Sequence, residues 1–175
     1  IPYDTYLFVI DKNICSGIET IRSADVTGQP VSEALIQGVY TSACRIYDDI
    51  AKVSSTSFPV YQEYVYSYHA IRFHRHMISI DEFLTELKRL TEVKEEYTLQ
   101  QKTSAIVKMN AYWIYYLRYK YNSPEEIKKE IDSTVHEILN FIRTIKPSDY
   151  TRSMNSNMLS FLQTISTYYP YDFLE

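Results

Sequence analysis

The side chains best suited to chemistry lie between residues 69 and 76, in the stretch HAIRFHRH. On a helix, His69, Arg72 and His76 share one face because they are spaced at i, i+3 and i+7. A helical zinc site needs histidines at i and i+4, and position 73 is phenylalanine. We therefore expect either a small anion-binding or pH-sensitive patch, or basic side chains that simply favour the C-terminal end of a helix.

The two cysteines, Cys15 and Cys44, are too few for a structural zinc site and are not spaced as CxxC. Turn residues between positions 25 and 30 predict an antiparallel helix pair, in which both cysteines lie within about one helical turn of each other. This geometry favours a disulfide, which would stabilise the chain by roughly 3–4 kcal/mol. A disulfide would also favour a secreted or extracellular protein. The alternative is two small buried thiols.

No enzyme motif is complete. Asp48 and Asp49 resemble the start of a DDxxD diphosphate site, but position 52, where the third aspartate belongs, is Lys52. The chain has no G-x-S-x-G stretch, and its 3 glycines are too few for a glycine-rich phosphate loop. We therefore predict a protein that is not an enzyme and that holds no cofactor and no metal.

Length and composition narrow the class of protein further. The 175 residues match one domain, so we expect residues 1–175 to form a single α-helical domain. The net charge of −4 gives no broad basic field, which argues against nucleic-acid binding. No run of about 20 apolar residues exists to span a membrane as a helix.

Apolar residues recur with a 3.6-residue period along most of the chain, which predicts helices. Segment 60–77 could also be a strand, but its spacing of tyrosines favours a helix. Segment 96–121 is apolar over most of its circumference, which is typical of a central helix. We therefore predict an all-α bundle of about seven helices, with an irregular tail at 168–175 that packs back on the body or on a partner. The expected helices cover about 4–23, 31–53, 60–77, 81–93, 96–121, 124–145 and 151–166.

Tyrosine is the most over-represented residue, with 18 copies that gather in segments 60–77 and 96–121 and in the tail. Rings this close in sequence cannot all point one way. They fit a tyrosine-rich core, a protein interface or an apolar ligand cavity. The candidate interface or pocket residues are Tyr61, Tyr64, Tyr68, Tyr112, Trp113, Tyr116, Tyr119, Tyr169, Tyr171 and Phe173.

The stretches SACRIY (residues 42–47) and SAI (residues 104–106), with an aromatic central helix among about seven, resemble viral Bcl-2-like proteins. The chain lacks the Asn-Trp-Gly-Arg signature of that family and has little glycine where that fold uses it. The resemblance implies an antagonist of a host protein.

Three functions follow as hypotheses. The first is an interaction protein, such as a secreted effector or an assembly subunit, that binds a protein partner or itself through a tyrosine-rich surface. The second is a carrier that holds an apolar ligand among Tyr64, Tyr112, Trp113 and Tyr116. The third is the Bcl-2-like antagonist.

Overall fold

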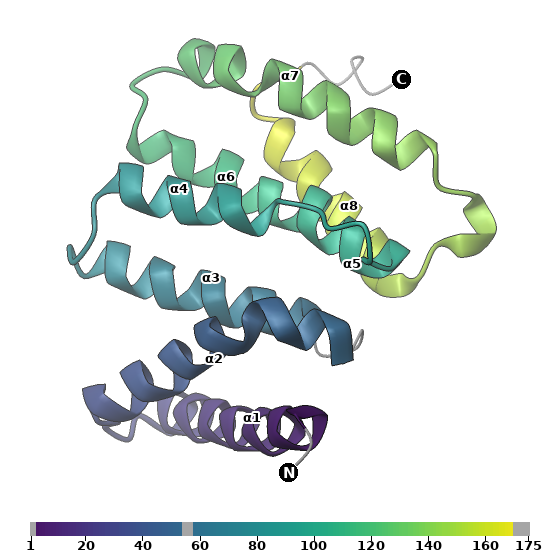
Figure 1. Ribbon diagram of the computed structural model, residues 1–175. Helices are drawn as coiled ribbons and strands as arrows, with labels where there is room; N and C mark the ends of the chain where they lie inside the picture. Colours follow the sequence, from purple (N-terminus) through teal and green to yellow (C-terminus); the bar gives the residue numbers. More distant parts are fainter. Residues whose placement is uncertain (1–2, 54–57, 170–175) are drawn as a thin grey trace. The chain divides into compact units, whose positions relative to one another are not determined.

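Helices form nearly all of the secondary structure in residues 3–53 and 58–169, which are the residues that the computed structural model describes (Figure 1). No strand occurs among these residues, so the predicted all-α fold class is confirmed. The chain divides into two compact units, Ile1–Arg75 and His76–Glu175. The expectation that residues 1–175 form one domain stays a prediction.

The first unit is built from α1 (Tyr3–Thr27), α2 (Glu33–Val53) and α3 (Phe58–His74), so the helical interpretation of segment 60–77 is confirmed. Helix α2 packs against both α1 and α3. Helix α1 extends beyond its predicted end and stops at Gly28, whose φ of 73° lies in the left-handed region. The Gln29 N–H then donates to the Ala24 carbonyl at 2.9 Å, which is the bond of a Schellman cap.

One close contact sets the distance between α1 and α2. A Cβ atom added to Gly17 on α1 would lie only 2.6 Å from Cγ2 of Val39 on α2. Because real Cβ atoms do not approach so closely, only glycine lets the two helices meet at this point.

Tyrosine hydroxyls join α3 to its neighbours. Tyr61 is fully buried, and its hydroxyl donates to Asp11 Oδ1 of α1 at 2.7 Å. The Gln62 amide donates to the Tyr47 hydroxyl of α2 at 3.1 Å. Burial, together with the bond to Asp11, raises the pKa of Tyr61. Both bonds satisfy polar groups that the packing of α3 removes from water.

The second unit begins with α4 (Ile80–Leu90) and continues through one long helical stretch. That stretch runs without a break through α5 (Leu99–Thr103), the π-helix η1 (Ser104–Met109), α6 (Asn110–Tyr116) and the 3₁₀ turn η2 (Leu117–Tyr119). Helix α7 (Pro124–Arg143), the 3₁₀ turn η3 (Pro147–Asp149) and α8 (Arg152–Ile165) complete it.

Side-chain caps fix where these helices begin. Ser79 and Thr98 form complete capping boxes with Glu82 and Gln101, three residues further on. The predicted helix over about 124–145 is present as α7, and its start is fixed by Ser123, whose side chain accepts the Glu126 backbone N–H, and by the proline that follows.

The helical stretch 99–119 is the centre of the second unit, as segment 96–121 predicted. Its η1 and α6 parts contact both α4 and α8, and Val107, Met109 and Ile114 have no exposed surface. The π-helix was not predicted, because one wider turn hardly disturbs an apolar pattern that already covers most of the circumference.

We predict that Tyr61→Phe lowers the free energy of unfolding by about 1–2 kcal/mol, because Asp11 loses a buried hydroxyl donor. Tyr68→Phe on the same helix is the matched control, since its half-exposed ring makes no hydroxyl contact of this kind. Its effect should stay within about 0.5 kcal/mol. Urea unfolding followed by circular dichroism measures both variants, and equal stabilities would contradict the role of the Tyr61 hydroxyl.

Candidate functional site

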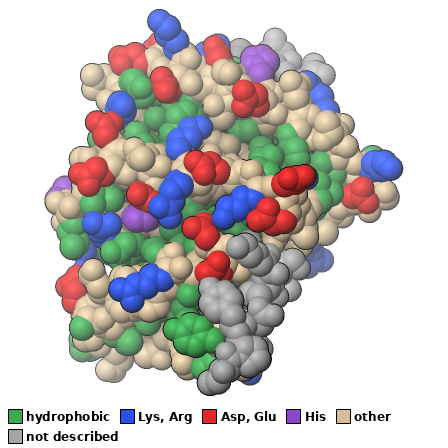
Figure 2. All heavy atoms as spheres, viewed as in Figure 1, with side chains coloured by type: hydrophobic (Ala, Val, Ile, Leu, Met, Phe, Trp, Pro, Cys, Tyr) green, Lys and Arg blue, Asp and Glu red, His purple; other side chains and the backbone are tan. Residues whose placement is uncertain are grey.

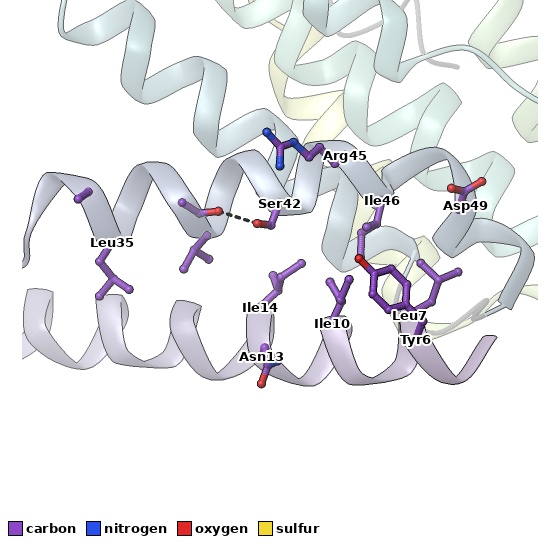
Figure 3. Close-up of a pocket in the computed structure, with 13 residues that line it drawn as sticks. Tyr6, Leu7, Ile10, Asn13, Ile14, Leu35, Ser42, Arg45, Ile46 and Asp49 are labelled. Atoms are coloured by element: carbon purple, nitrogen blue, oxygen red, sulfur yellow. Dashed lines mark hydrogen bonds between the residues drawn. The ribbon is translucent and has the colours of Figure 1, made fainter. Parts of the chain in front are cut away.

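An open groove of about 530 Å³ lies between α1 and α2 on the first unit. Figure 3 shows Ile10 and Ile14 of α1 and Leu35 of α2 pointing into the space between the two helices. The lining is mostly apolar, so water gains few hydrogen bonds there. An unfilled apolar surface of this kind favours an occupant that removes it from water.

Three small residues of α2 form part of one wall of the groove. Ala34, Gly38 and Ser42 follow each other at intervals of four residues, and so they lie one above another on one face of the helix. Ser42 Oγ donates to the Gly38 carbonyl at 2.8 Å, which satisfies the hydroxyl within its own helix. This part of the α2 wall therefore carries only small side chains, and the Ser42 hydroxyl needs no hydrogen-bond partner from an occupant of the groove.

Gly38 differs from Gly17 in what surrounds it. A Cβ added to Gly38 would meet no atom within 4 Å, whereas one added to Gly17 would collide with Val39. Glycine in the middle of a helix costs roughly 0.5–1 kcal/mol relative to alanine. Packing within the first unit explains Gly17 and does not explain Gly38.

Polar and half-exposed side chains border the groove. Figure 3 shows Asn13 and Arg45 at its outer edges, on α1 and α2 respectively. Arg45 and Asp49 lie one turn apart on α2, so a positive and a negative charge border the same part of the groove. Two large apolar side chains in the lining remain partly in water, Tyr6 with 55% and Leu35 with 38% of their surface exposed.

The predicted tyrosines of α3 serve mainly as core residues. Tyr64 is buried edge-on against Tyr61 and Tyr40, with ring centroids 5.5 and 6.5 Å apart. Burial raises the pKa of Tyr64 to about 12. Tyr68 is half-exposed, and the Arg72 guanidinium lies 5.1 Å from the centre of its ring.

The aromatic residues predicted on the central helix divide between core and surface. Trp113 and Tyr116 are buried, and Tyr112 is half-buried. Tyr119 keeps 47% of its surface exposed and stacks on Tyr116 with ring centroids 5.5 Å apart. The predicted ligand-lining set stays a prediction, because Tyr64 belongs to the first unit and the other three residues to the second.

The tail is described only as far as Tyr169. Tyr169 is buried, and its hydroxyl donates to the Asp132 carboxylate of α7. Lys128 lies beside both, 3.3 Å from Asp132 Oδ1 and 4.9 Å from the centre of the Tyr169 ring. Tyr171 and Phe173 lie outside the described residues.

The three residues of the predicted anion or pH patch have different surroundings. His69 is buried, and its ring packs against the ring of Tyr68. The Arg72 guanidinium lies over the same Tyr68 ring. His76 is exposed, has a φ of 61° and begins the second unit. The shared role of these residues stays a prediction.

The predicted disulfide between Cys15 and Cys44 is wrong, because the two cysteines are not bonded to each other. The heights of the two cysteines agree with the prediction, because the Gly17–Val39 contact puts the α1 position level with Cys44 near residue 12, about one turn from Cys15. The Cys15 thiol instead donates to Asp11 Oδ1 at 3.6 Å and contacts Tyr64 of α3. The argument for a secreted protein that rested on the disulfide falls with it.

Charge is mixed on the molecular surface. In the view of Figure 2, lysine and arginine side chains lie among aspartate and glutamate side chains and form no single field of one sign. Among residues 3–53 and 58–169, no group of three or more histidine, cysteine, aspartate or glutamate side chains is placed to hold a metal ion. In that same part of the chain, no helix has the length and apolar character needed to cross a membrane.

We predict that the docking of Tyr169 is sensitive to acid. The Tyr169 hydroxyl lowers the pKa of Asp132 below its ordinary value of 3.8. A carboxylate with a lowered pKa stabilises the folded state at higher pH, and this contribution is lost as the pH falls from about 3.8 through the lowered pKa. The Tyr169 ring resonances in NMR spectra should therefore shift toward exposed-tyrosine values below that pH.

Asp132→Asn should remove this acid transition, and Asp149→Asn, at an exposed position of η3, should leave it unchanged. A transition that survives in Asp132→Asn would assign it to another group.

We predict that both cysteines react as thiols when the chain is unfolded without reductant. Ellman's reagent should titrate the same number of thiols before and after treatment with dithiothreitol, and a lower number before treatment would restore the disulfide. In the folded protein Cys15 should react slowly, because burial, aided by the neighbouring Asp11 carboxylate, raises the pKa of its thiol.

Sequence reasoning missed the α1–α2 groove. The signal in the sequence was the set of small residues at 34, 38 and 42, which lie at intervals of four beside the apolar positions of α2. Comparison of the chain with protein-family models, with curated proteins and with solved structures finds no match. The function is therefore argued from the residues of the groove.

Proposed function

We propose that the first unit is a protein-binding module whose α1–α2 groove accepts an amphipathic helix from a partner protein. The observation that carries the proposal is Gly38, a glycine inside a helix that faces an open apolar groove and has no neighbour within 4 Å of an added Cβ. A glycine at such a position lets the backbone of an incoming helix approach α2 closely.

The groove has the dimensions of a helix-binding site. Its α2 wall extends from Ala34 to Asp49, which is about 22 Å at 1.5 Å per residue. This length matches roughly four turns of a partner helix, with an apolar side chain directed into the groove at every third or fourth position.

Charges at the border of the groove define the partner further. Arg45 favours an acidic side chain on the partner helix, and Asp49 favours a basic one a turn away. A partner with this charge order would lie in one direction along α2. The partner is therefore an amphipathic helix with an apolar stripe flanked by an acidic and a basic residue.

The binding hypothesis drawn from the tyrosines is retained with a different surface. Tyr61, Tyr64, Tyr116 and Tyr169 are buried and are unavailable to a partner without unfolding. Tyr6, which lines the groove and is 55% exposed, is the tyrosine best placed to contact the incoming helix.

Selection from a phage-displayed library of 20-residue amphipathic helical peptides tests the proposal on the full chain. We predict that selected peptides share an apolar stripe and lose at least about tenfold in affinity against Gly38→Leu, which fills the floor of the groove; tenfold is about 1.4 kcal/mol. Leucine is a better helix former than glycine, so this variant should fold. Gln37→Leu, one position away and outside the groove lining, is the matched control and should bind normally.

Peptides that bind wild type and Gly38→Leu equally would overturn the assignment of the groove. The absence of any enriched peptide would overturn the function. Light scattering adds a third outcome: a dimer of the wild-type chain that becomes a monomer in Gly38→Leu would show that the occupant is a second copy, against the proposed partner helix.

A further inference from the structure

A second concave surface lies wholly within the second unit. It is an open cleft of about 610 Å³ between α4 and the end of the central helix, with Glu130 of α7 at its border. Its lining combines two apolar side chains, Leu84 and Leu117, with charged groups of both signs. The groove of the first unit has no part in it.

The end of the π-helix η1 orients a buried hydrogen-bond partner of Lys88, a cationic side chain of the cleft. At the end of the π-helix, the Asn110 side chain donates from Nδ2 to the Ile106 carbonyl at 2.8 Å. This bond fixes the amide so that Asn110 Oδ1 accepts from Lys88 Nζ of α4 at 3.2 Å. π-Turns recur at functional sites because they direct side chains where a regular helix does not.

Lys88 is held on a second side by an aromatic ring. Its Nζ atom lies 3.5 Å from the centre of the Trp113 ring, within cation–π distance. An ammonium has three N–H donors, and Asn110 and the indole face occupy two. Burial lowers the pKa of Lys88, while the carboxylates of Glu137 and Glu130 act in the opposite direction. An anionic group supplied by a ligand would complete the coordination of this half-buried cation.

The other charged groups of the cleft decide what else the ligand carries. Asp81 and Lys120 neutralise each other at 2.8 Å, and Arg89 lies 4.0 Å from Glu86. Glu130 lies close enough to Tyr121 to raise the pKa of its hydroxyl, after the larger effect of burial. Glu92 lines the same cleft. A simple anion would be attracted by Lys88 and repelled by these two carboxylates, so charge complementarity requires a positive group as well.

We propose that this cleft binds a small zwitterion with an apolar side chain, of the chemical class of free aliphatic α-amino acids. The ligand carboxylate binds the Lys88 ammonium, its own ammonium binds the Glu130 carboxylate, and its side chain packs against Leu84 and Leu117. This site is independent of the helix-binding groove.

The only tryptophan of the chain reports on the site, because Trp113 contacts the Lys88 ammonium. The probes are L-leucine, isoamylamine, which lacks the carboxylate, and 4-methylpentanoate, which lacks the ammonium. We predict a saturable change of Trp113 fluorescence with L-leucine and at least about tenfold weaker binding of both comparison compounds. No saturable change with L-leucine overturns the proposal, and equal binding of 4-methylpentanoate reduces the site to a carboxylate site and overturns the zwitterion.

Variants assign the contacts. Lys88→Met nearly keeps the length of the side chain and removes its charge, so it should abolish the fluorescence response to L-leucine. The matched control is Lys129→Met on the exposed face of α7, which carries the same charge change and should not alter that response. Glu130→Gln should weaken L-leucine without weakening 4-methylpentanoate. Unchanged binding of L-leucine to Lys88→Met or to Glu130→Gln contradicts the proposed contacts, and the comparison of the three compounds on wild type stands even if a variant fails to fold.

Discussion

A buried tyrosine must place its hydroxyl against a hydrogen-bond partner, and within each unit this requirement links segments that are far apart in sequence. In the first unit the hydroxyl of the fully buried Tyr61 donates a hydrogen bond to Asp11 of α1. In the second unit Tyr169 binds Asp132 of α7 in the same way. Each bond connects residues far apart in sequence, 50 positions in the first case and 37 in the second. A core of leucine would pack as well and would impose no such register.

The sequence was sufficient to predict where the helices lie along the chain. It was insufficient to predict which residues of one helix contact which residues of another. Apolar spacing is a local pattern, so it predicted helix positions from neighbouring residues alone. Whether a given tyrosine is buried depends on the helix that faces it, and no local pattern contains that information. The disulfide failed for the same reason: Cys15 and Cys44 have compatible heights in the hairpin, but the Cys15 thiol contacts Asp11 on its own helix and Tyr64 of α3, a neighbour that no local pattern contains.

Gly17 and Gly38 are the same residue type in one helix pair, but their surroundings differ. Both lie inside continuous helices, and both have the same intrinsic cost. Gly17 is explained by a neighbour that occupies the space of its missing side chain, and Gly38 by open space that nothing in the first unit fills. Similarly, Lys88 and Trp113 are 25 positions apart, and only the packing of α4 on the central helix reveals that they lie together in one cleft.

The π-helix also determines where the length of the chain can vary. A π-turn is wider than an α-turn and takes up one extra residue, so removing one residue from Ser104–Met109 would leave a regular α-helical turn. Trp113, Tyr116 and Leu117 would keep the face that they now occupy. A deletion within the α-helical part that follows would instead rotate the residues after it by about 100°. The wide turn is therefore the place in the central helix where a residue can be lost without turning its second half away from α4 and α8.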